Sequence, residues 1–305
     1  MRNKTLFHSI AGGFGTALLF VSAQIFAQDM ALSDILVPGE EWQLVAEGYQ
    51  FTRAACADAE GNFYFTDLAK GTTINKISTE GKLSVFVENA PKLSGLKFGP
   101  DGRLFGCAQG GLKQIVAFDK LGKMSVIASD VEPNDLIVSR KGAIYFTESG
   151  KSQVTYIDPV GVKRVGDKGI SQPSGLTLSP DQGTLVVSDH RGTNLWAFRI
   201  QPNGTLDAKE PYMTVWTPNG KPESSSDGMT TDGAGRYYVA SAAGIQVFDP
   251  TGRLCGILTK PQDKFLANLG FAGPNLEYLC VTCSDKIYRR KTTAHGVLFF
   301  QKQGG

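Results

Sequence analysis

The chain has 305 residues, of which 31 are basic and 29 acidic, and these charges are spread along the sequence without blocks of one sign. A net charge of +2 gives no electrostatic reason to expect a nucleic-acid or membrane-surface partner. Glycine accounts for 36 residues and helical apolar periodicity is hard to find after residue 40, so we expect a nearly all-β protein.

Residues 1–27 have the pattern of a secretory signal peptide. A short basic region at residues 2–4 precedes a mostly apolar or small stretch, residues 10–26, and Ala27 is a small residue suited to cleavage. We therefore expect export to the periplasm or the medium, with residues 28–40 as a leader or linker.

A membrane anchor is the rival interpretation of the same stretch. Polar Ser22 and Gln24 interrupt it, and no basic flank follows it. These features favour a cleaved leader, so we expect no membrane partner after cleavage.

A hairpin pattern recurs six times after the leader. Each copy opens with a polar residue, passes through a small apolar strand, turns at a cluster of Gly, Pro or Asp, and continues into an aromatic or β-branched strand. The copies are RAACADAEGNFYFTD, SGLKFGPDGRLFGCA, NDLIVSRKGAIYFTE, SGLTLSPDQGTLVVSD, DGMTTDGAGRYYVAS and NLGFAGPNLEYLCVTCS.

The opening residues are spaced by 41, 40, 40, 53 and 41 positions, which is the length of one four-stranded antiparallel blade. The pattern therefore predicts a six-bladed β-propeller over residues 41–295, followed by a C-terminal strand or tail at 296–305. The long interval contains residues 201–226, whose Pro, Gly and Ser content predicts a loop beside the channel or a partial lid.

A propeller must join its first and last blades, because an open ring would leave sheet edges unpaired. Residues 42–46, WQLVA, precede the first hairpin and are strand-like. We expect them to form the outer strand of the last blade, beside residues 286–289 or 296–300.

Five cysteines in an exported chain are an odd number, so at least one is free or pairs with another molecule. Cys280 and Cys283 resemble a CxxC pair, but residues three apart in an extended strand point to opposite faces. We expect buried thiols.

The first residue of each inner strand should lie at one mouth of the central channel, so the six opening residues should converge. Ser, Asn and Asp at such places also cap turns, and this explanation suffices for Ser94 and Asn268. An Arg and an Asp facing one narrow channel indicate a site, because buried unpaired charges are costly. The six positions are Arg53, Ser94, Asn134, Ser174, Asp227 and Asn268.

The ordered motifs EGNFYFTD, PNDLIV, AIYFTE, PSGLTLSPD, SDGMTTD and GRYYVASAAGIQVFDPTG resemble the SMP-30/gluconolactonase/LRE-like family over about residues 41–290. The resemblance implies a six-bladed propeller whose enzymes bind one divalent cation, calcium or zinc, and hydrolyse sugar lactones. The family's metal-binding Asp, also a candidate base, matches Asp227, and its metal- and substrate-adjacent Asn matches Asn134. A cation held by such oxygens can polarise a lactone carbonyl.

Two positions depart from the family pattern. Arg53 stands in FTRAA where the family's FTEGP has a metal-binding Glu, and Ser174 stands in PSG where the family's PNG has a ligand Asn. Because a guanidinium cannot ligate a cation, we expect Arg53 to occupy the metal position and to pair with Asp227.

Three functions remain open from the sequence. A lactonase or related ester hydrolase would use Asp227 as base and Arg53 or a residual metal as electrophile, with Arg53, Asn134 and Ser174 contacting the substrate. A non-catalytic propeller would bind an anionic or sugar-like small molecule through Arg53 and Asn134. A scaffold would recognise a protein partner through its loops.

Overall fold

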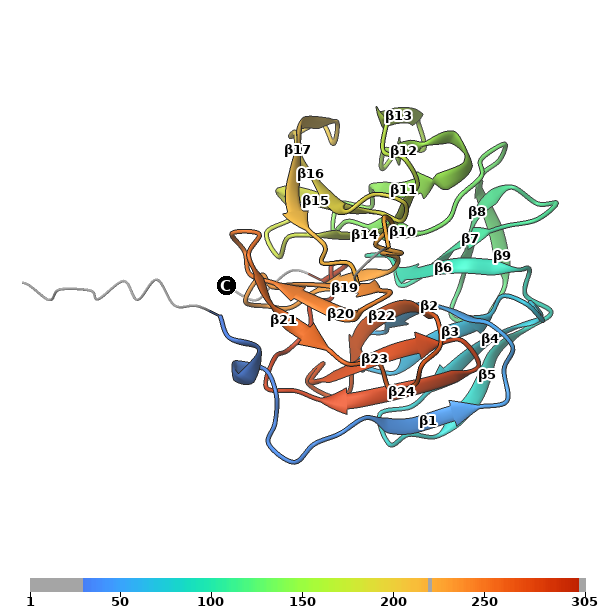
Figure 1. Cartoon of the computed structure of the whole chain (residues 1–305). Coiled ribbons are helices and arrows are strands. Elements are labelled where there is room, and N and C mark those ends of the chain that lie inside the picture. Colours follow the sequence, from blue (N-terminus) through green and yellow to red (C-terminus); the bar gives the residue numbers. More distant parts are fainter. Residues whose placement is uncertain (1–29, 219–220, 302–305) are drawn as a thin grey trace, which may run out of the picture.

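A computed structural model describes residues 30–218 and 221–301 of the chain, so the predicted signal peptide lies outside the described residues. The described part forms six four-stranded antiparallel sheets, arranged as blades around one axis (Figure 1). The only helical elements in these residues are two 3-10 turns, η1 (Leu32–Asp34) and η2 (Ser149–Lys151). The predicted six-bladed propeller is confirmed.

Five blades are built from four consecutive strands, and the sixth combines three consecutive strands with the first strand of the chain. The innermost strands of neighbouring blades contact one another around the axis. The first blade comprises β2 (Thr52–Ala57), β3 (Phe63–Asp67), β4 (Thr73–Ile77) and β5 (Leu83–Glu88). The second comprises β6 (Leu93–Phe98), β7 (Leu104–Ala108), β8 (Gln114–Phe118) and β9 (Met124–Ala128), and the third β10 (Leu136–Val138), β11 (Ile144–Glu148), β12 (Gln153–Ile157) and β13 (Lys163–Lys168). The fourth comprises β14 (Pro173–Leu178), β15 (Thr184–Asp189), β16 (Asn194–Ile200) and β17 (Leu206–Thr214), and the fifth β18 (Met229–Thr231), β19 (Tyr237–Ser241), β20 (Gly244–Phe248) and β21 (Leu254–Leu258). The sixth comprises β22 (Leu266–Ala272), β23 (Tyr278–Cys283), β24 (Lys286–Lys291) and β1 (Gln43–Glu47).

The ring closes through β1, as the sequence predicted. Gln43 lies opposite Arg289 and Glu47 opposite Lys286 in an antiparallel pairing of β1 with β24. The alternative partner, residues 296–300, is wrong, because these residues instead cross the far end of the channel. There they line a cavity together with residues from all six inner strands.

Hairpin turns between the first and second strands follow from Asp and Gly at fixed places. In the first blade, the Asp58 carboxylate accepts the backbone N–H groups of Glu60 at 3.1 Å and Asn62 at 2.9 Å. Gly61 has φ +86°, a conformation that other residues rarely adopt. The corresponding aspartates of three other hairpins, Asp101, Asp181 and Asp232, bind their own turns in the same way.

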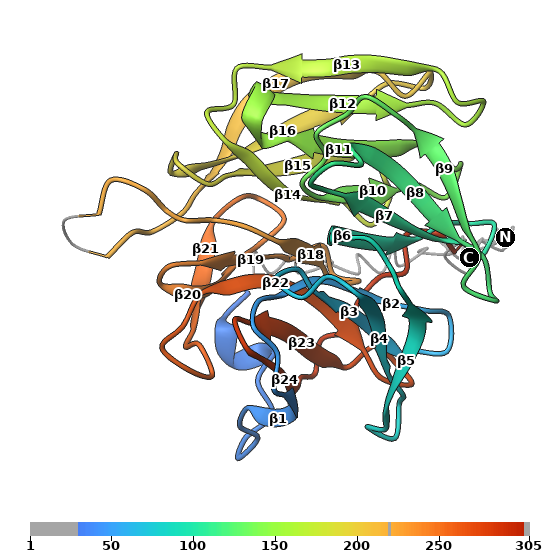
Figure 2. The same cartoon turned by 90° about the vertical axis from the view of Figure 1, so that its right-hand side faces the viewer.

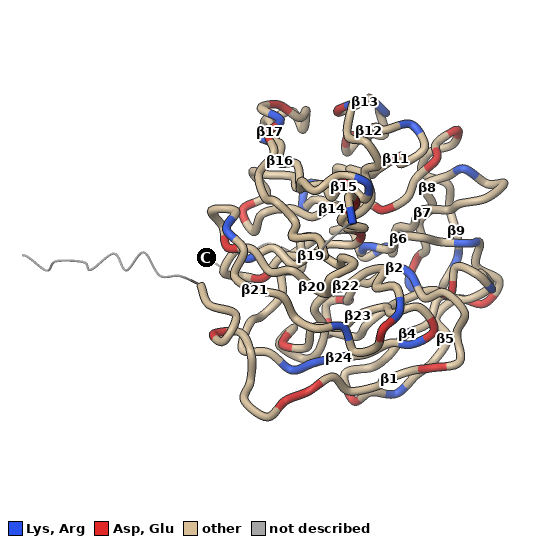
Figure 3. The backbone as a smooth tube through the Cα atoms, in the orientation of Figure 1, with Lys and Arg blue, Asp and Glu red and all other residues tan. Residues whose placement is uncertain are grey.

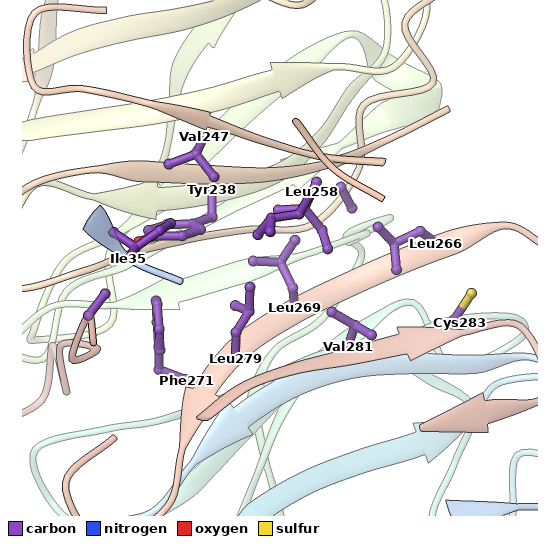
Figure 4. Close-up of a cluster of buried hydrophobic side chains, with 13 residues drawn as sticks. Ile35, Tyr238, Val247, Leu258, Leu266, Leu269, Phe271, Leu279, Val281 and Cys283 are labelled. Carbon is purple, nitrogen blue, oxygen red and sulfur yellow. The ribbon is translucent and has the colours of Figure 1, made fainter. Parts of the chain in front are cut away.

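Apolar side chains pack between neighbouring blades, because each sheet presents both faces to another sheet. Figure 4 shows one such cluster, in which Tyr238 and Val247 of the fifth blade meet Leu269 and Val281 of the sixth. Ile35, from the segment before β1, covers one end of this cluster and is 1% exposed. Clusters of this kind between neighbouring blades make the ring a rigid support for its central channel.

The interval of 53 residues is partly strand rather than loop. Residues 206–214 form β17, the outer strand of the fourth blade, so the prediction of a loop over all of 201–226 is wrong for these residues. Pro211 suggested a loop, because proline has no backbone N–H for a sheet hydrogen bond. The outer strand of a blade tolerates proline, since no further strand pairs with its outer edge. Part of the remainder forms a loop that projects away from the blades (Figure 2), whereas Ser224 and Ser226 are buried and bind the Asp189 carbonyl oxygen. Trp216 fastens the loop to Gln246 of β20 through hydrogen bonds of 2.8 and 2.7 Å.

All five cysteines are free, and four of them are buried, which confirms the expectation of buried thiols for Cys56, Cys107, Cys280 and Cys283. Cys255 is partly exposed. Basic and acidic residues are interspersed over the described chain (Figure 3), in agreement with their even spread along the sequence. Within the described residues, no helix is both long and apolar enough to cross a membrane.

Candidate functional site at the channel mouth

The start of the inner strands brings charged and polar residues together from four blades. Arg53 and Ser174 are the second residues of β2 and β14, whereas Asn134 and Asp227 lie two residues before β10 and β18. Neighbouring inner strands approach so closely that a Cβ on Gly175 would lie 2.2 Å from the Asp227 carbonyl oxygen. This close approach brings the Ser174 side chain next to that of Asp227.

Arg53 and Asp227 form a buried ion pair. Arg53 Nη1 lies 2.6 Å from Asp227 Oδ2, and the two side chains are 8% and 3% exposed. Arg53 Nη2 is 3.5 Å from the other carboxylate oxygen, Oδ1. The pairing expected from two opposite charges in one channel is confirmed.

Asn134 and Ser174 complete a closed hydrogen-bonded ring with this pair. Arg53 Nη2 donates to Asn134 Oδ1 at 3.3 Å, and Asn134 Nδ2 donates to Ser174 Oγ at 3.0 Å. Ser174 Oγ in turn donates to Asp227 Oδ1 at 2.7 Å. The residues that the sequence proposed as contacts for a ligand are therefore neighbours, and partly exposed Asn134 is where the ring reaches the solvent.

Ser94 and Asn268 differ from the other four opening residues. Ser94 Oγ donates to the Asn134 carbonyl oxygen at 2.6 Å, so it holds the backbone of the third blade and faces the protein. Asn268 lies one step deeper in the channel, where its Nδ2 donates to Asp135 Oδ2 at 3.3 Å. Its backbone N–H bonds to Thr282 Oγ1, just as that of Asp135 bonds to Thr147 Oγ1.

The expectation that Asn268 belongs to the mouth ring is therefore wrong by one residue, and Ala267 takes that position. The two Asn-containing motifs, NDLIV and NLGF, look alike, but Asn268 corresponds to Asp135. Each of these two side chains accepts the N–H of the leucine that follows it, at 2.8 and 2.9 Å. Because Asn134 and Asn268 both open similar motifs, the sequence alone paired them, although Asn268 makes the same local hydrogen bond as Asp135.

Asp135 was not identified from the sequence, although it directly follows Asn134. It is 1% exposed, and burial raises its pKa to about 6 against the opposing charge of Lys97. Asp135 and Asn268 therefore lie together in the channel below the mouth ring.

A partly exposed aromatic arc above the ion pair was also missed. Phe51 and Phe265 have ring centres 5.9 Å apart, and the guanidinium carbon of Arg53 lies 5.8 Å from the Phe51 ring. His190 continues the arc at 6.2 Å from Phe265, and its Nδ1 lies 3.2 Å from the Ser226 carbonyl oxygen. His190 directly follows β15 and is partly buried.

The donors of Arg53 are not all used. Among the described residues, its Nε is one of four buried side-chain nitrogens without a hydrogen-bond partner. A buried unpaired N–H is costly, so such groups usually have a partner that binds at the site or an ordered water. The Arg53 Nε–H therefore needs an oxygen acceptor that the described residues do not supply.

These residues do not fit a divalent cation. The ring offers one carboxylate, one amide oxygen and one hydroxyl, and the guanidinium already binds both the carboxylate and the amide oxygen. No group of three or more His, Cys, Asp or Glu side chains in the described ranges is arranged to hold a metal ion. Hard cations require several oxygen ligands, and a fixed positive charge within the ring repels them.

A family model for the SMP-30/Gluconolactonase/LRE-like region matches residues 51–285. The chain belongs to this family. It is 26% identical to a gluconolactonase from Zymomonas mobilis, over 87% of this chain and 84% of the relative.

Two solved structures share the fold of this chain. One is a gluconolactonase from Xanthomonas campestris, with a TM-score of 0.74 and 23% identity over 86% of this chain and 92% of that one. The other is the calcium-binding protein regucalcin from Agrobacterium tumefaciens, with a TM-score of 0.73 and 14% identity over 87% of this chain and 98% of that one. At these identities the likeness shows the fold alone.

Proposed function

We propose that this chain hydrolyses a lactone or a related carboxylic ester at the channel mouth, with Arg53 as the electrophile and Asp227 as the base. The observation that carries the proposal is the buried Arg53–Asp227 pair, which lies where the inner strands of the propeller begin. Relationship to a gluconolactonase supports a lactone as the small-molecule substrate.

Arg53 can stabilise the negative charge that develops on the carbonyl oxygen. Its unpaired Nε–H is a preoriented donor in a largely buried site, where such hydrogen bonds are stronger than in water. Phe51 limits the hydration of the guanidinium from one side. Asn134 Nδ2, which donates to Ser174, keeps the amide oriented with its oxygen toward Arg53.

Asp227 can take a proton from the attacking water. Each of its oxygens accepts a short hydrogen bond, from Arg53 Nη1 and from Ser174 Oγ, but a carboxylate has about four lone-pair positions and retains capacity. The water oxygen adds to the carbonyl carbon as its proton passes to Asp227. The ring C–O bond then breaks, and the departing alkoxide takes that proton, which leaves a hydroxy acid.

No step in this scheme passes through a divalent cation. We propose that Arg53 takes the place of the metal that the family resemblance implies, because its guanidinium supplies a fixed positive charge next to Asp227 and Asn134. Arg53 and Ser174 stand where the family pattern has two metal ligands.

A second candidate function is non-catalytic binding of an anionic or sugar-like ligand. Both Asp227 oxygens already accept hydrogen bonds, from Arg53 and from Ser174, and this favours binding because hydrogen-bonded carboxylate oxygens accept a proton less readily. In this case Arg53 Nε and Asn134 would hold a ligand carboxylate without turnover.

Hydrolysis of a panel of five- and six-membered lactones, measured with and without a chelator, tests the proposal. We expect turnover that survives the chelator, at least a hundredfold loss in Asp227→Asn and Arg53→Met, and little change in the control Asp101→Asn, which lies in an exposed hairpin turn. Absence of turnover, combined with a melting shift on addition of a ring-opened hydroxy acid, would replace catalysis by the binding function.

We also propose that the chain is exported and cleaved after Ala27, on the basis of its first 27 residues. Intact mass of the protein purified from the periplasm or the medium should then correspond to a chain that begins at Gln28. A full-length mass in the cytoplasmic fraction would contradict export.

A further inference from the structure

The mouth of the channel is divided into an aromatic half and a polar half. Phe51, Phe265 and His190 form the aromatic arc, which runs from the first blade across the sixth and fifth to the fourth. All three side chains are only partly buried, so the arc borders solvent. Arg53 and Asp227 lie beneath it.

A small residue, Ser225, lies in the fifth blade between Phe265 and His190. In the fifth blade, Ser225 occupies the place that Phe51 and Phe265 occupy in theirs, and its N–H binds the His190 carbonyl oxygen at 3.0 Å. His190 therefore reaches over this blade to within 6.2 Å of Phe265. The result is a row of three neighbouring rings beside the Arg53–Asp227 pair.

Polar side chains border the opposite half of the mouth. Gln109 Nε2 lies 3.5 Å from Asn134 Oδ1, and Lys113 pairs with Glu132 at 2.7 Å. Gln109, Lys113 and Glu132 line a pocket at the edge of the second and third blades. A ligand that spans the mouth would thus meet rings on one side and hydrogen-bonding groups on the other.

We infer that the site selects a substrate with an apolar ring next to its carbonyl or carboxylate group, such as an aryl-substituted lactone or ester, in preference to a polyhydroxylated sugar lactone. This inference rests on the proposed function, since it takes Arg53 as the contact for the oxygen atoms of the substrate. A sugar lactone carries hydroxyl groups around its ring, so it presents less apolar surface to the arc and gains less from packing against it. An aromatic ring would instead gain stacking or edge contacts with Phe51 and Phe265.

Two lactones with the same ring size separate these alternatives. A phenyl-substituted δ-valerolactone and glucono-δ-lactone both release an alkoxide, so the comparison concerns recognition of the substituents. We expect Phe265→Ala to lower kcat/KM for the phenyl lactone about tenfold, and to change that for glucono-δ-lactone less than twofold. Phe300→Ala, at a partly buried ring on the far end of the channel, is the matched control and should change neither value.

Binding of the ring-opened acids, measured by calorimetry, decides the inference independently of catalysis. We expect the phenyl hydroxy acid to bind at least tenfold more tightly than gluconate, and Phe265→Ala to remove most of this difference while Arg53→Met weakens both acids. Equal or tighter binding of gluconate, or a Phe265→Ala variant that binds both acids as the parent does, would overturn the inference. If neither lactone is hydrolysed but the phenyl acid shows this preference, the proposed function fails and the ligand class stands.

Discussion

The Arg53–Asp227 ion pair should dominate the energetics of the channel mouth, and a double-mutant cycle measures it. Arg53→Met and Asp227→Asn each leave one buried charge without its partner. For side chains only 8% and 3% exposed, this should cost about 3–5 kcal/mol of unfolding free energy, or roughly 6–15 °C in Tm. The double variant removes both charges, so its loss should fall short of the sum by about 2 kcal/mol or more.

Arg103 and Asp101 provide a matched control cycle in the same protein. Their closest N–O distance is 2.7 Å, close to the 2.6 Å of the buried pair, but the side chains are 38% and 44% exposed. Thermal and urea unfolding of Arg103→Met, Asp101→Asn and the double variant should give a coupling below about 1 kcal/mol. Additive losses within about 0.5 kcal/mol at Arg53 and Asp227 would refute the view that burial makes this pair exceptional.

Three further predictions concern the frame around the site. Deletion of residues 43–47 exposes the edge of β24 and should lower the Tm of the whole domain, so unchanged thermal unfolding would remove this closure. Truncation after residue 296 removes Phe299, which is 7% exposed against the third and fourth blades, and should cost about 2–3 kcal/mol in urea unfolding; a loss below about 0.5 kcal/mol would show that the tail does not pack as described. Burial alone would raise the pKa of Glu148, but hydrogen bonds from Lys151, Thr155 and Gln153 lower it to about 2, so the carboxylate stabilises the fold above its ordinary pKa of 4.5 and loses this effect as the pH falls toward 2. The stability difference between the parent and Glu148→Gln, measured by urea unfolding at several pH values, should therefore shrink from pH 5 to pH 2, and a difference independent of pH would contradict this assignment.

The architecture was predictable because it depends on a repeated local pattern. Each blade carries its own hairpin signals, such as Asp58 and Gly61 in the first turn, and six copies at regular spacing leave few arrangements open. The closing strand was also predictable, since a ring with an unpaired edge is unstable and residues 42–46 were the available strand.

The centre of the candidate site followed from the same repeat together with charge. Equivalent positions in a ring converge, and an Arg and an Asp that share a narrow channel must pair, as Arg53 and Asp227 do. The position of Asn268 did not follow from the sequence. Its side chain accepts the next backbone N–H, as that of Asp135 does, and a shift of one residue along a strand does not change the residue types by which the motif was recognised.

Long-range packing accounts for what the sequence could not reveal. Phe51 and Phe265 lie two residues before equivalent strand positions, but this equivalence appears only once Ala267 is recognised as the counterpart of Arg53. The course of residues 297–300 across the far end of the channel depends on contacts with inner strands of every blade, and nothing local to the tail encodes them.

Calcium titration of the purified protein, followed by calorimetry, tests most directly whether Arg53 has taken the place of a metal ion. The account predicts no binding to the parent at millimolar calcium, and binding with a Kd of about 10 µM or tighter in Arg53→Glu/Ser174→Asn, which restores both family ligands. Stoichiometric calcium binding to the parent with micromolar affinity would contradict it.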